Sequence, residues 1–253
     1  AISRVESWGV DFVDPRIAEG KAKIATEDAI VTAVARAAGE RPLAGRHVVV
    51  TAGATTETVD PVRTLSNRAS GRTGRAVARA CHVLGADVTL VHDGADVPYA
   101  TVEPVESAAE MTAAVAAVAD EADALVSAAA ISDYTVDAAD EKLRSGQERL
   151  TLELEPTPKL VDTVRADHPD LHIVGFKLES SGGDEGLLAR ARDLIERVDL
   201  SFVVANDASV IGETGTRALL VEADDHSEYT GDKSGLGLAI AERLAEKLGE
   251  QSS

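Results

Sequence analysis

The stretch that decides the fold is His47-Val-Val-Val-Thr-Ala-Gly-Ala-Thr-Thr56. Residues 48–52 form an apolar run with the length of one buried strand, and a turn containing Gly53 follows it. A polar segment then leads to a helix that starts near Gly71. Free backbone N–H groups at the start of such a helix attract anions. The order of strand, glycine turn, polar loop and helix therefore predicts an anion site.

The charge pattern around this stretch supports the same interpretation. No acidic residue lies between Asp60 and Asp87, although the chain has 44 Asp and Glu against 25 Lys and Arg and a formal net charge of −19. Such a protein repels anions at long range, so an anionic ligand needs a local positive region. The arginines in this window are Arg63, Arg68, Arg72, Arg75 and Arg79. We interpret residues 48–79 as the anion-binding part of a nucleotide-dependent enzyme.

Short apolar runs alternate with helical patterns along the rest of the chain. This alternation predicts an α/β fold with a doubly wound, mostly parallel, Rossmann-like sheet. Strands are expected at 48–52, 87–92, 124–129, 149–155, 173–176, 202–205 and 217–222, and helices at 73–84, 108–120, 160–165, 185–197 and 234–248. Ligands bind beyond the carboxyl ends of the strands in such sheets. That rule selects the loops 52–72, 93–99, 129–147 and 205–216.

The composition excludes several classes of protein. Aromatic residues make up 3% of the chain and the charge balance is acidic, which argues against nucleic-acid binding. The single Cys81 excludes an internal disulfide and a zinc site built from several thiolates. No apolar run approaches the roughly 20 residues of a membrane span. We expect a cytoplasmic protein with no membrane or nucleic-acid partner, whose acidic surface is halophile-like or that of an ordinary acidic protein.

The selected loops carry side chains suited to nucleotide chemistry. The first loop lacks the Gly-x-Gly-x-x-Gly of dinucleotide enzymes and the Gly-Lys-Ser/Thr of P-loop NTPases, but it contains Asn67. The amide of Asn67 can donate to a carboxylate or acyl oxygen, or it can cap the helix. In the third loop Asp133 suits Mg²⁺ or a ribose, and Lys142 is either a mobile charge for phosphates or a solvated surface residue. Asn206, at a strand end, can contact a ligand or form an Asx turn.

A set of motifs runs through residues 45–248 in a fixed order. They are Thr51-Ala-Gly-x-Thr-x-Glu57, Asp60-Pro-Val-Arg63, Ser66-Asn-Arg-x-Ser-Gly71, Ala129-x-x-x-Asp-Tyr134, Glu141-Lys-x-x-x-Gly146, Leu150-Thr-Leu-Glu-Leu154, Val174-Gly-Phe-Lys177 and Val204-Ala-Asn-Asp207. This set resembles phosphopantothenoylcysteine synthetase, a coenzyme A pathway enzyme often fused behind a flavin-dependent decarboxylase. The resemblance implies a synthetase domain at 46–250, a linker at 39–45, and the C-terminal tail of a preceding decarboxylase domain at 1–38.

The resemblance also implies an activity, which is the joining of 4′-phosphopantothenate to L-cysteine through an acyl-nucleotidylate. CTP is the expected nucleotide, ATP is the alternative, Mg²⁺ is required, and FMN belongs only to the decarboxylase portion. The implied catalytic residues are Asn67 and Lys142. The implied nucleotide-binding residues are Gly53, Ser127, Ala128, Ala129, Asp133, Lys142, Thr157, Pro158, Lys159, Leu160, Phe176 and Arg192, and Asp133 is also the implied metal ligand. The implied substrate-binding residues are Asn67, Arg68, Ser70, Gly71 and Asn206.

Two features qualify these implications. Ala54 stands where the family often has proline, and Glu196 stands where many relatives have a lysine for the nucleotide, which leaves the triphosphate contacts open. The expected strand at 149–155 projects from the third loop and is interpreted as a dimerisation element. Relatives are dimers whose sites receive residues from the partner, so a homodimer is expected.

Two other functional classes remain as alternatives. A Rossmann-type oxidoreductase is disfavoured by the missing glycine fingerprint and by His92-Asp93 at the end of the second strand. A non-catalytic nucleotide-binding module is disfavoured because Asn67, Asp133 and Lys142 all match the family pattern.

Overall fold

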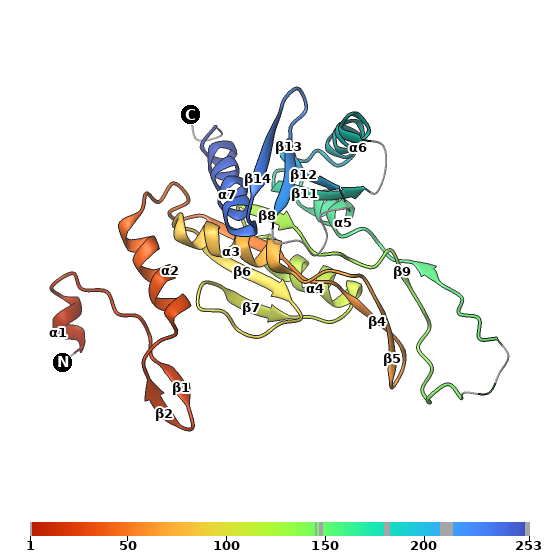
Figure 1. The fold of residues 1–253 in the computed structure, drawn as a ribbon, viewed down its shortest axis with the longest axis horizontal. Helices are drawn as coiled ribbons and strands as arrows, with labels where there is room; N and C mark the ends of the chain where they lie inside the picture. The colour runs from red at the N-terminus through yellow and green to blue at the C-terminus, as the bar shows by residue number, and fades with distance from the viewer. Residues whose placement is uncertain (1, 145, 147–148, 180–182, 208–214, 251–253) are drawn as a thin grey trace.

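An eight-stranded mixed sheet forms the centre of the computed structural model (Figure 1), which describes residues 2–144, 146, 149–179, 183–207 and 215–250. Its strands are β3 (His47–Thr51), β6 (Asp87–His92), β7 (Thr101–Pro104), β8 (Ala124–Ser127), β11 (His172–Glu179), β12 (Phe202–Asp207), β13 (Thr216–Val221) and β14 (His226–Gly231). They lie in the order β14-β13-β12-β11-β8-β3-β6-β7. All neighbours from β12 to β7 are parallel, whereas β13 and β14 join antiparallel at one edge. The expectation of a mostly parallel sheet is confirmed.

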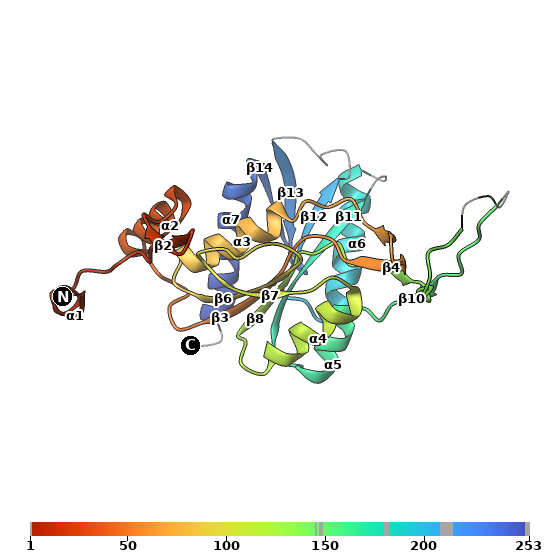
Figure 2. The same ribbon diagram turned by 90° about the horizontal axis from the view of Figure 1, so that it is seen from below.

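Helices cover both faces of this sheet (Figure 2). One face carries α3 (Arg72–Val83) and α7 (Lys233–Glu250), and the other carries α4 (Ala108–Ala119), α5 (Leu160–Asp167) and α6 (Gly183–Val198). Alternate strand residues supply the two cores, since Val48 and Val50 pack on the first face and Val49 on the second. This alternation is the period-2 pattern of a strand buried on both sides. None of the helices in the described ranges combines the length and apolar character needed to cross a membrane.

Three small hairpins lie outside the main sheet. They are β1 (Arg16–Ala18) with β2 (Lys21–Lys23), β4 (Thr56–Asp60) with β5 (Arg63–Ser66), and β9 (Tyr134–Thr135) with β10 (Glu155–Pro156). The segment between β9 and β10 projects from the body at the end opposite the N-terminus (Figures 1 and 2). The β4–β5 hairpin thus lies in the first loop that the sequence selects, 52–72, and β9 lies in the third, 129–147.

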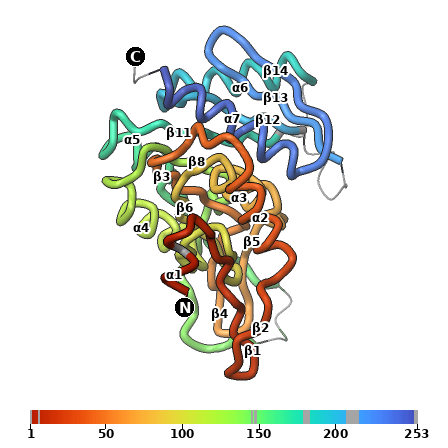
Figure 3. The backbone as a smooth tube through the Cα atoms, turned by 90° about the vertical axis from the view of Figure 1, so that its left-hand side faces the viewer, coloured from red at the N-terminus to blue at the C-terminus, as the bar shows by residue number. Residues whose placement is uncertain are grey.

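The N-terminal segment contains α1 (Ile2–Glu6) and α2 (Glu27–Ala38). α2 lies beside α3, while the β1–β2 hairpin extends away from the sheet (Figure 3). Arg36 of α2 donates to the carbonyls of Gly85 and Ala86, at 3.0 and 2.9 Å, just past the end of α3. Arg36 also donates to the carbonyl of His82, in the last turn of α3, where the helix leaves carbonyls without an intrahelical partner. α2 is therefore fixed to the body by polar contacts.

Some sequence expectations were wrong. Residues 151–154 form no strand, and only Glu155–Pro156 pairs with another segment. Alternation of Leu150, Leu152 and Leu154 suggested a strand, but these leucines are exposed, and among the described residues no strand pairs with 151–154.

Other strands were missed. β4 and β5 occupy the expected polar loop 52–72, β7 follows the loop 93–99, and β14 lies between the expected strand at 217–222 and the expected helix at 234–248. β14 is a polar edge strand, so it lacks the apolar signal used to find strands. For β4 and β5, the Asp60-Pro61 pair was an available turn signal.

Candidate functional site

The candidate site lies where the sheet changes its winding direction. From β3 the chain moves to β6 and β7 on one side, and later to β8, β11 and β12 on the other. The adjacent ends of β3 and β8 pair Thr51 with Ser127. Beyond them Ala129 donates its N–H to Thr51 Oγ1 at 3.2 Å, and Ala130 donates to the Gly53 carbonyl at 2.9 Å. Such a switch point is the usual ligand site of an open α/β sheet. The structure thus brings Gly53 and residues 127–129 together, as the sequence indicated.

Three glycines pack tightly at this point. Gly53 and Gly71 have φ values of +85° and +66°, in the left-handed region that favours glycine. A Cβ on Gly71 would lie 2.8 Å from the Gly53 nitrogen, and one on Gly74 would lie 2.6 Å from Ala52 Cβ. These contacts match the roles of a dinucleotide glycine fingerprint, namely a tight turn, close backbone approach and close helix–strand packing. Residues 54–70 separate the glycines, which is why a contiguous motif is absent from the sequence.

The first turn of α3 provides free backbone donors beside these glycines. Gly71 is the N-cap and supplies no side-chain hydrogen bond, and no acidic residue lies in the first turn. The N–H groups of Arg72, Thr73 and Gly74 have no partner within the helix, because the helical ladder starts with Arg75 N–H to the Gly71 carbonyl at 3.0 Å. This end of the helix suits an anion.

Part of the arginine cluster is already neutralised. Arg63 pairs with Asp60, and Arg79 pairs with Asp28 of α2 at 2.9 Å. Arg75 donates to the Ser70 carbonyl at 2.7 Å. Within the described part of the chain, the exposed Arg68 and Arg72 have no acidic partner. Ser70 and Arg68 lie on the exposed segment that leads from the hairpin to α3.

Asn67 reaches the switch point from the end of the β4–β5 hairpin. Its Nδ2 donates to the Ala130 carbonyl at 3.1 Å. Next to it Ser66 Oγ donates to the Thr55 carbonyl at 2.9 Å, which closes the base of the hairpin. An asparagine amide has two N–H donors and one carbonyl acceptor. One donor therefore fixes the side chain, while the second donor and the oxygen are available to a ligand.

A second group of expected residues gathers around Asp133. Thr157 donates its N–H to the Asp133 carbonyl at 3.0 Å, and Lys159 Nζ pairs with the Asp133 carboxylate. Pro158 lies between Thr157 and Lys159, and Leu160, which is 2% exposed, begins α5. In the described ranges no three His, Cys, Asp or Glu side chains gather to hold a metal ion. A lone carboxylate still fits Mg²⁺ that is shared with phosphates and keeps water ligands.

Lys142 lies beside the other end of the same hairpin. Its neighbour Leu143 donates its N–H to Asp60 Oδ2 at 3.0 Å and accepts from Arg63 Nη1 at 3.1 Å. Burial would raise the pKa of Asp60, but hydrogen bonds from Val62, Leu143 and Arg63 hold it below the usual value. The Lys142 side chain itself is exposed. The structure therefore places Lys142 near the hairpin turn, away from the hairpin base that carries Asn67.

The remaining expected residues lie on β11, β12 and α6. Phe176 is half-buried on β11, directly beside Val204 of β12. Arg192 of α6 is half-buried, and its Nε has no hydrogen-bond partner among the described residues. Neither is joined to the switch point by a hydrogen bond in the described part of the chain. Residues 208–214 of the expected loop 205–216 lie outside the described residues.

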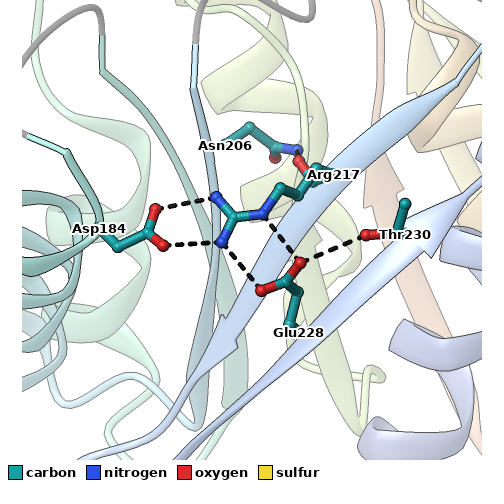
Figure 4. A network of polar contacts seen from close by, with 5 residues as sticks. All are labelled: Asp184, Asn206, Arg217, Glu228 and Thr230. Atoms are coloured by element: carbon teal, nitrogen blue, oxygen red, sulfur yellow. Dashed lines mark hydrogen bonds and ion pairs between the residues drawn. The ribbon is translucent and has the colours of Figure 1, made fainter.

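Asn206 is held by β13 (Figure 4). Its Nδ2 donates to the Arg217 carbonyl at 2.9 Å. The Arg217 guanidinium in turn donates to Asp184 at 2.8 and 2.7 Å and to Glu228 at 2.9 Å. Hydrogen bonds from Arg217 lower the pKa of both carboxyl groups. Asn206 thus makes a cross-strand contact with a backbone carbonyl beside an ion-pair cluster.

The framework around this site includes residues that were not predicted from the sequence. Gly74 and the buried carboxylates of Glu57 and Asp60 were absent from the expected site. Glu57 and Asp60 are both part of the motifs given in the sequence analysis. Acidic residues placed among the apolar positions of a short strand could have indicated that these carboxylates are buried. Gly74 follows Gly71 at the spacing of the last two fingerprint glycines.

Comparison with known proteins identifies the family. Residues 43–248 match the model of the DNA/pantothenate metabolism flavoprotein C-terminal domain. The chain belongs to this family. It is 42% identical over 228 residues to the coenzyme A biosynthesis bifunctional protein CoaBC of Thermococcus kodakarensis, which covers 88% of the chain and 56% of that protein. It is 32% identical over 242 residues to the CoaBC protein of Methanocaldococcus jannaschii, which covers 94% of the chain and 59% of that protein.

Two solved structures share the fold of this chain. The C-terminal domain of a CoaBC protein superposes with a TM-score of 0.71 at 26% identity, which covers 83% of this chain and all of that domain. The H337A mutant of Cab2, solved with phosphopantothenate-cysteine, has a TM-score of 0.67 at 16% identity and covers 88% of this chain and 94% of that one. The chain spans a little over half the length of the two CoaBC proteins that it matches.

Proposed function

We propose that this chain is the ligase part of a coenzyme A biosynthesis protein and joins 4′-phosphopantothenate to L-cysteine. The observation that carries the proposal is the meeting of Asn67, the start of α3 and the small residues 127–129 at the switch point of a chain in this family. The required chemistry has two steps. A carboxylate oxygen of phosphopantothenate first attacks the α-phosphorus of a nucleoside triphosphate, and pyrophosphate leaves. The cysteine amine then attacks the acyl carbon, and the nucleoside monophosphate leaves with the bonding electrons.

The residues of the site suit these steps. The free N–H of Asn67 donates to a carboxylate or acyl oxygen, and the Ala130 carbonyl keeps the amide in place beforehand. Preorganised donors of this kind stabilise developing charge without reorganisation. The N–H groups at the start of α3, together with Arg68 and Arg72, attract a phosphate or carboxylate against the overall negative charge. Gly53 and residues 127–129 leave room for a ligand to approach the backbone.

The nucleotide is proposed to bind at the residues that gather around Asp133 and at neighbouring segments. Asp133, residues 157–160, Phe176, Arg192 and Lys142 would line it, with CTP as the nucleotide and ATP as the alternative. When bound with the triphosphate, Mg²⁺ would neutralise charge on the phosphates, and Asp133 would be its protein ligand. The lysine paired with Asp133, Lys159, would then be released to the phosphates. Lys142 would bring a further positive charge from the loop beside the hairpin.

The domain and partner assignments are part of the same proposal. Residues 46–250 would form the ligase domain, 39–45 the linker, and 1–38 the end of a decarboxylase domain that carries FMN. A homodimer would use the projecting segment between β9 and β10. This segment exposes Leu150, Leu152 and Leu154 at 52, 40 and 44%, which favours contact with a second copy.

The proposal is tested by pyrophosphate release. The chain, in a buffer of high salt that suits its acidic surface, is given Mg²⁺, 4′-phosphopantothenate and one nucleoside triphosphate, with or without cysteine. We expect release that depends on phosphopantothenate, is fastest with CTP, and yields phosphopantothenoylcysteine when cysteine is present. A folded sample that releases no pyrophosphate with any triphosphate would refute the ligase assignment.

A further inference from the structure

The β4–β5 hairpin carries two buried carboxylates that differ in their partners. Glu57 is 5% exposed and Asp60 is 1% exposed. Glu57 faces one N–H donor and one hydroxyl, since Oε1 accepts from Ala108 N–H and Oε2 from Thr135 Oγ1, both at 2.9 Å. Asp60 faces only nitrogen donors. Because a buried carboxylate without hydrogen bonds is unfavourable, both sets of contacts are needed.

The partners of Asp60 include the segment that carries Lys142. Oδ1 accepts from Val62 N–H at 2.8 Å and Oδ2 accepts from Leu143 N–H at 3.0 Å, while Arg63 pairs with the same carboxylate. Arg63 Nη1 also donates to the Leu143 carbonyl at 3.1 Å. The Asp60–Arg63 pair therefore holds both backbone polar groups of Leu143.

This contact is the main attachment of the projecting segment to the hairpin. Among the described residues between β9 and β10, only Ala139 and Leu143 make hydrogen bonds to it, and Ala139 does so through its N–H to the Val59 carbonyl at 3.0 Å. Lys142 is exposed, so packing does not fix it. The backbone of the next residue is thus what determines where the lysine starts.

We infer that Asp60 is a positioning residue, which holds Leu143 and thereby sets Lys142 in a constant place relative to Asn67 at the base of the same hairpin. The inference rests on the proposed function, in which Lys142 acts on the phosphates. A rigid two-stranded element between the two side chains keeps their separation defined. Reactions that join two bound molecules lose rate steeply when catalytic groups are displaced.

Glu57 provides a matched control on the same hairpin. Glu57→Gln keeps both hydrogen bonds, because the amide oxygen accepts from Ala108 N–H and the Thr135 hydroxyl rotates to accept from the new amide. In Asp60→Asn the amide nitrogen faces Leu143 N–H and Arg63, or else Val62 N–H, and none of these groups can become an acceptor. Both changes remove one negative charge from the hairpin and preserve the side-chain shape.

The test compares the two variants in the ligase reaction. We expect Asp60→Asn to lower the turnover number about ten- to a hundredfold, as loss of a hydrogen bond to a charged group predicts. Its affinity for 4′-phosphopantothenate, measured by calorimetry, should change by less than about threefold, because the base of the hairpin is intact. Glu57→Gln should stay within about threefold of the parent in both measurements. Equal turnover in both variants, or equal losses in turnover and affinity, would overturn the inference.

A measurement on the unaltered chain covers the case in which Asp60→Asn does not fold. Hydrogen exchange should show the Leu143 amide protected relative to the exposed segment around it. Rapid exchange at Leu143 would overturn the inference, since the contact on which it depends would be absent. The exchange result does not depend on turnover. An unaltered chain that shows Leu143 protection but no pyrophosphate release would refute the ligase assignment instead.

Discussion

The two helices α3 and α4 lie on opposite faces of one sheet and begin in opposite ways. At the start of α4, Ser107 Oγ accepts from Glu110 N–H at 3.1 Å, and Glu110 Oε2 accepts from Ser107 N–H at 3.2 Å and Glu106 N–H at 2.7 Å. Glu57 accepts from Ala108 N–H at 2.9 Å. The start of α3 has a glycine N-cap with no side-chain hydrogen bond, and its first turn is basic.

This difference separates a helix start that the protein caps from one whose N–H groups are not capped by a side chain. A capping box with acidic residues satisfies the free N–H groups and suits the helix dipole. Arginines in the first turn oppose the dipole, so the start of α3 is unfavourable by itself. An anion bound there would supply the missing negative charge. Of these two helices, the one whose start lies at the switch point lacks a side-chain cap.

The largest expected effect comes from giving α3 an acidic cap. Gly71→Asp and Gly71→Asn both place a side chain at a left-handed position close to Gly53. Either side-chain oxygen can accept from the helix N–H groups, but only Asp places a negative charge there. We expect the turnover of Gly71→Asp to be at least about a hundredfold below that of Gly71→Asn, as for other losses of preorganised charge stabilisation. Pyrophosphate release checks this, and equal rates in the two variants would show that negative charge at the start of α3 does not affect the reaction.

The reverse change removes a cap from α4. Ser107→Ala should lower the free energy of unfolding by about 1 kcal/mol, the usual effect of losing an N-cap side chain. Urea denaturation measures it. Affinity for 4′-phosphopantothenate and CTP should remain that of the parent, because within the described part of the chain Ser107 forms no hydrogen bond to a residue expected to contact a ligand. A loss of affinity with no loss of stability would break the distinction between the two helices.

A smaller effect is expected at the basic first turn of α3. Arg72→Gln should weaken binding of the anionic substrates about two- to fivefold at low ionic strength, and the difference should shrink as salt is added. Calorimetry at two salt concentrations measures this. Exposed Arg41→Gln changes net charge equally and serves as the control, since Arg41 lies outside the site. If the two variants weaken binding equally, the effect comes from the net charge of the protein and not from the position of Arg72.

The smallest effect concerns pH and the capping box of α4. Hydrogen bonds from Glu106 and Ser107 N–H groups hold the pKa of Glu110 below its ordinary value of 4.5. The ionised cap therefore stabilises the fold fully above pH 4.5, and this contribution is lost as the pH falls through the lowered pKa. The stability difference between the parent and Glu110→Gln should be constant at higher pH and narrow below 4.5. Urea midpoints across this range check it, and a difference that grows on acidification would contradict it.

The sequence was a good guide wherever a signal was local and apolar. The strands β3, β6 and β8 were found because they are short and mostly apolar, and the strand-end rule then pointed to Gly53 and residues 127–129. The β4–β5 hairpin was not found, because its strands are short and charged and its buried Glu57 and Asp60 resemble surface residues in sequence.

Long-range contacts were the other limit. The packing of Gly71 against Gly53 brings together residues on either side of the hairpin, and no local pattern indicates it. The same holds for Leu143 and Asp60, which determine where Lys142 lies. Motif resemblance named Asn67 and Lys142 but gave no information on their separation. Their separation is set by the β4–β5 hairpin, which lies between them.

The one cysteine of the chain has a practical consequence. Cys81 lies in α3 and is fully buried in the hydrophobic core to which α7 also contributes. Burial raises its pKa to about 12. Thiol–disulfide exchange and alkylation need a thiolate, so this side chain is inert under ordinary conditions. A working solution rich in free cysteine would leave the protein without mixed disulfides. A single cysteine introduced on the surface would then be the only reactive thiol, and a fluorescent or spin label attached there would report on one known position.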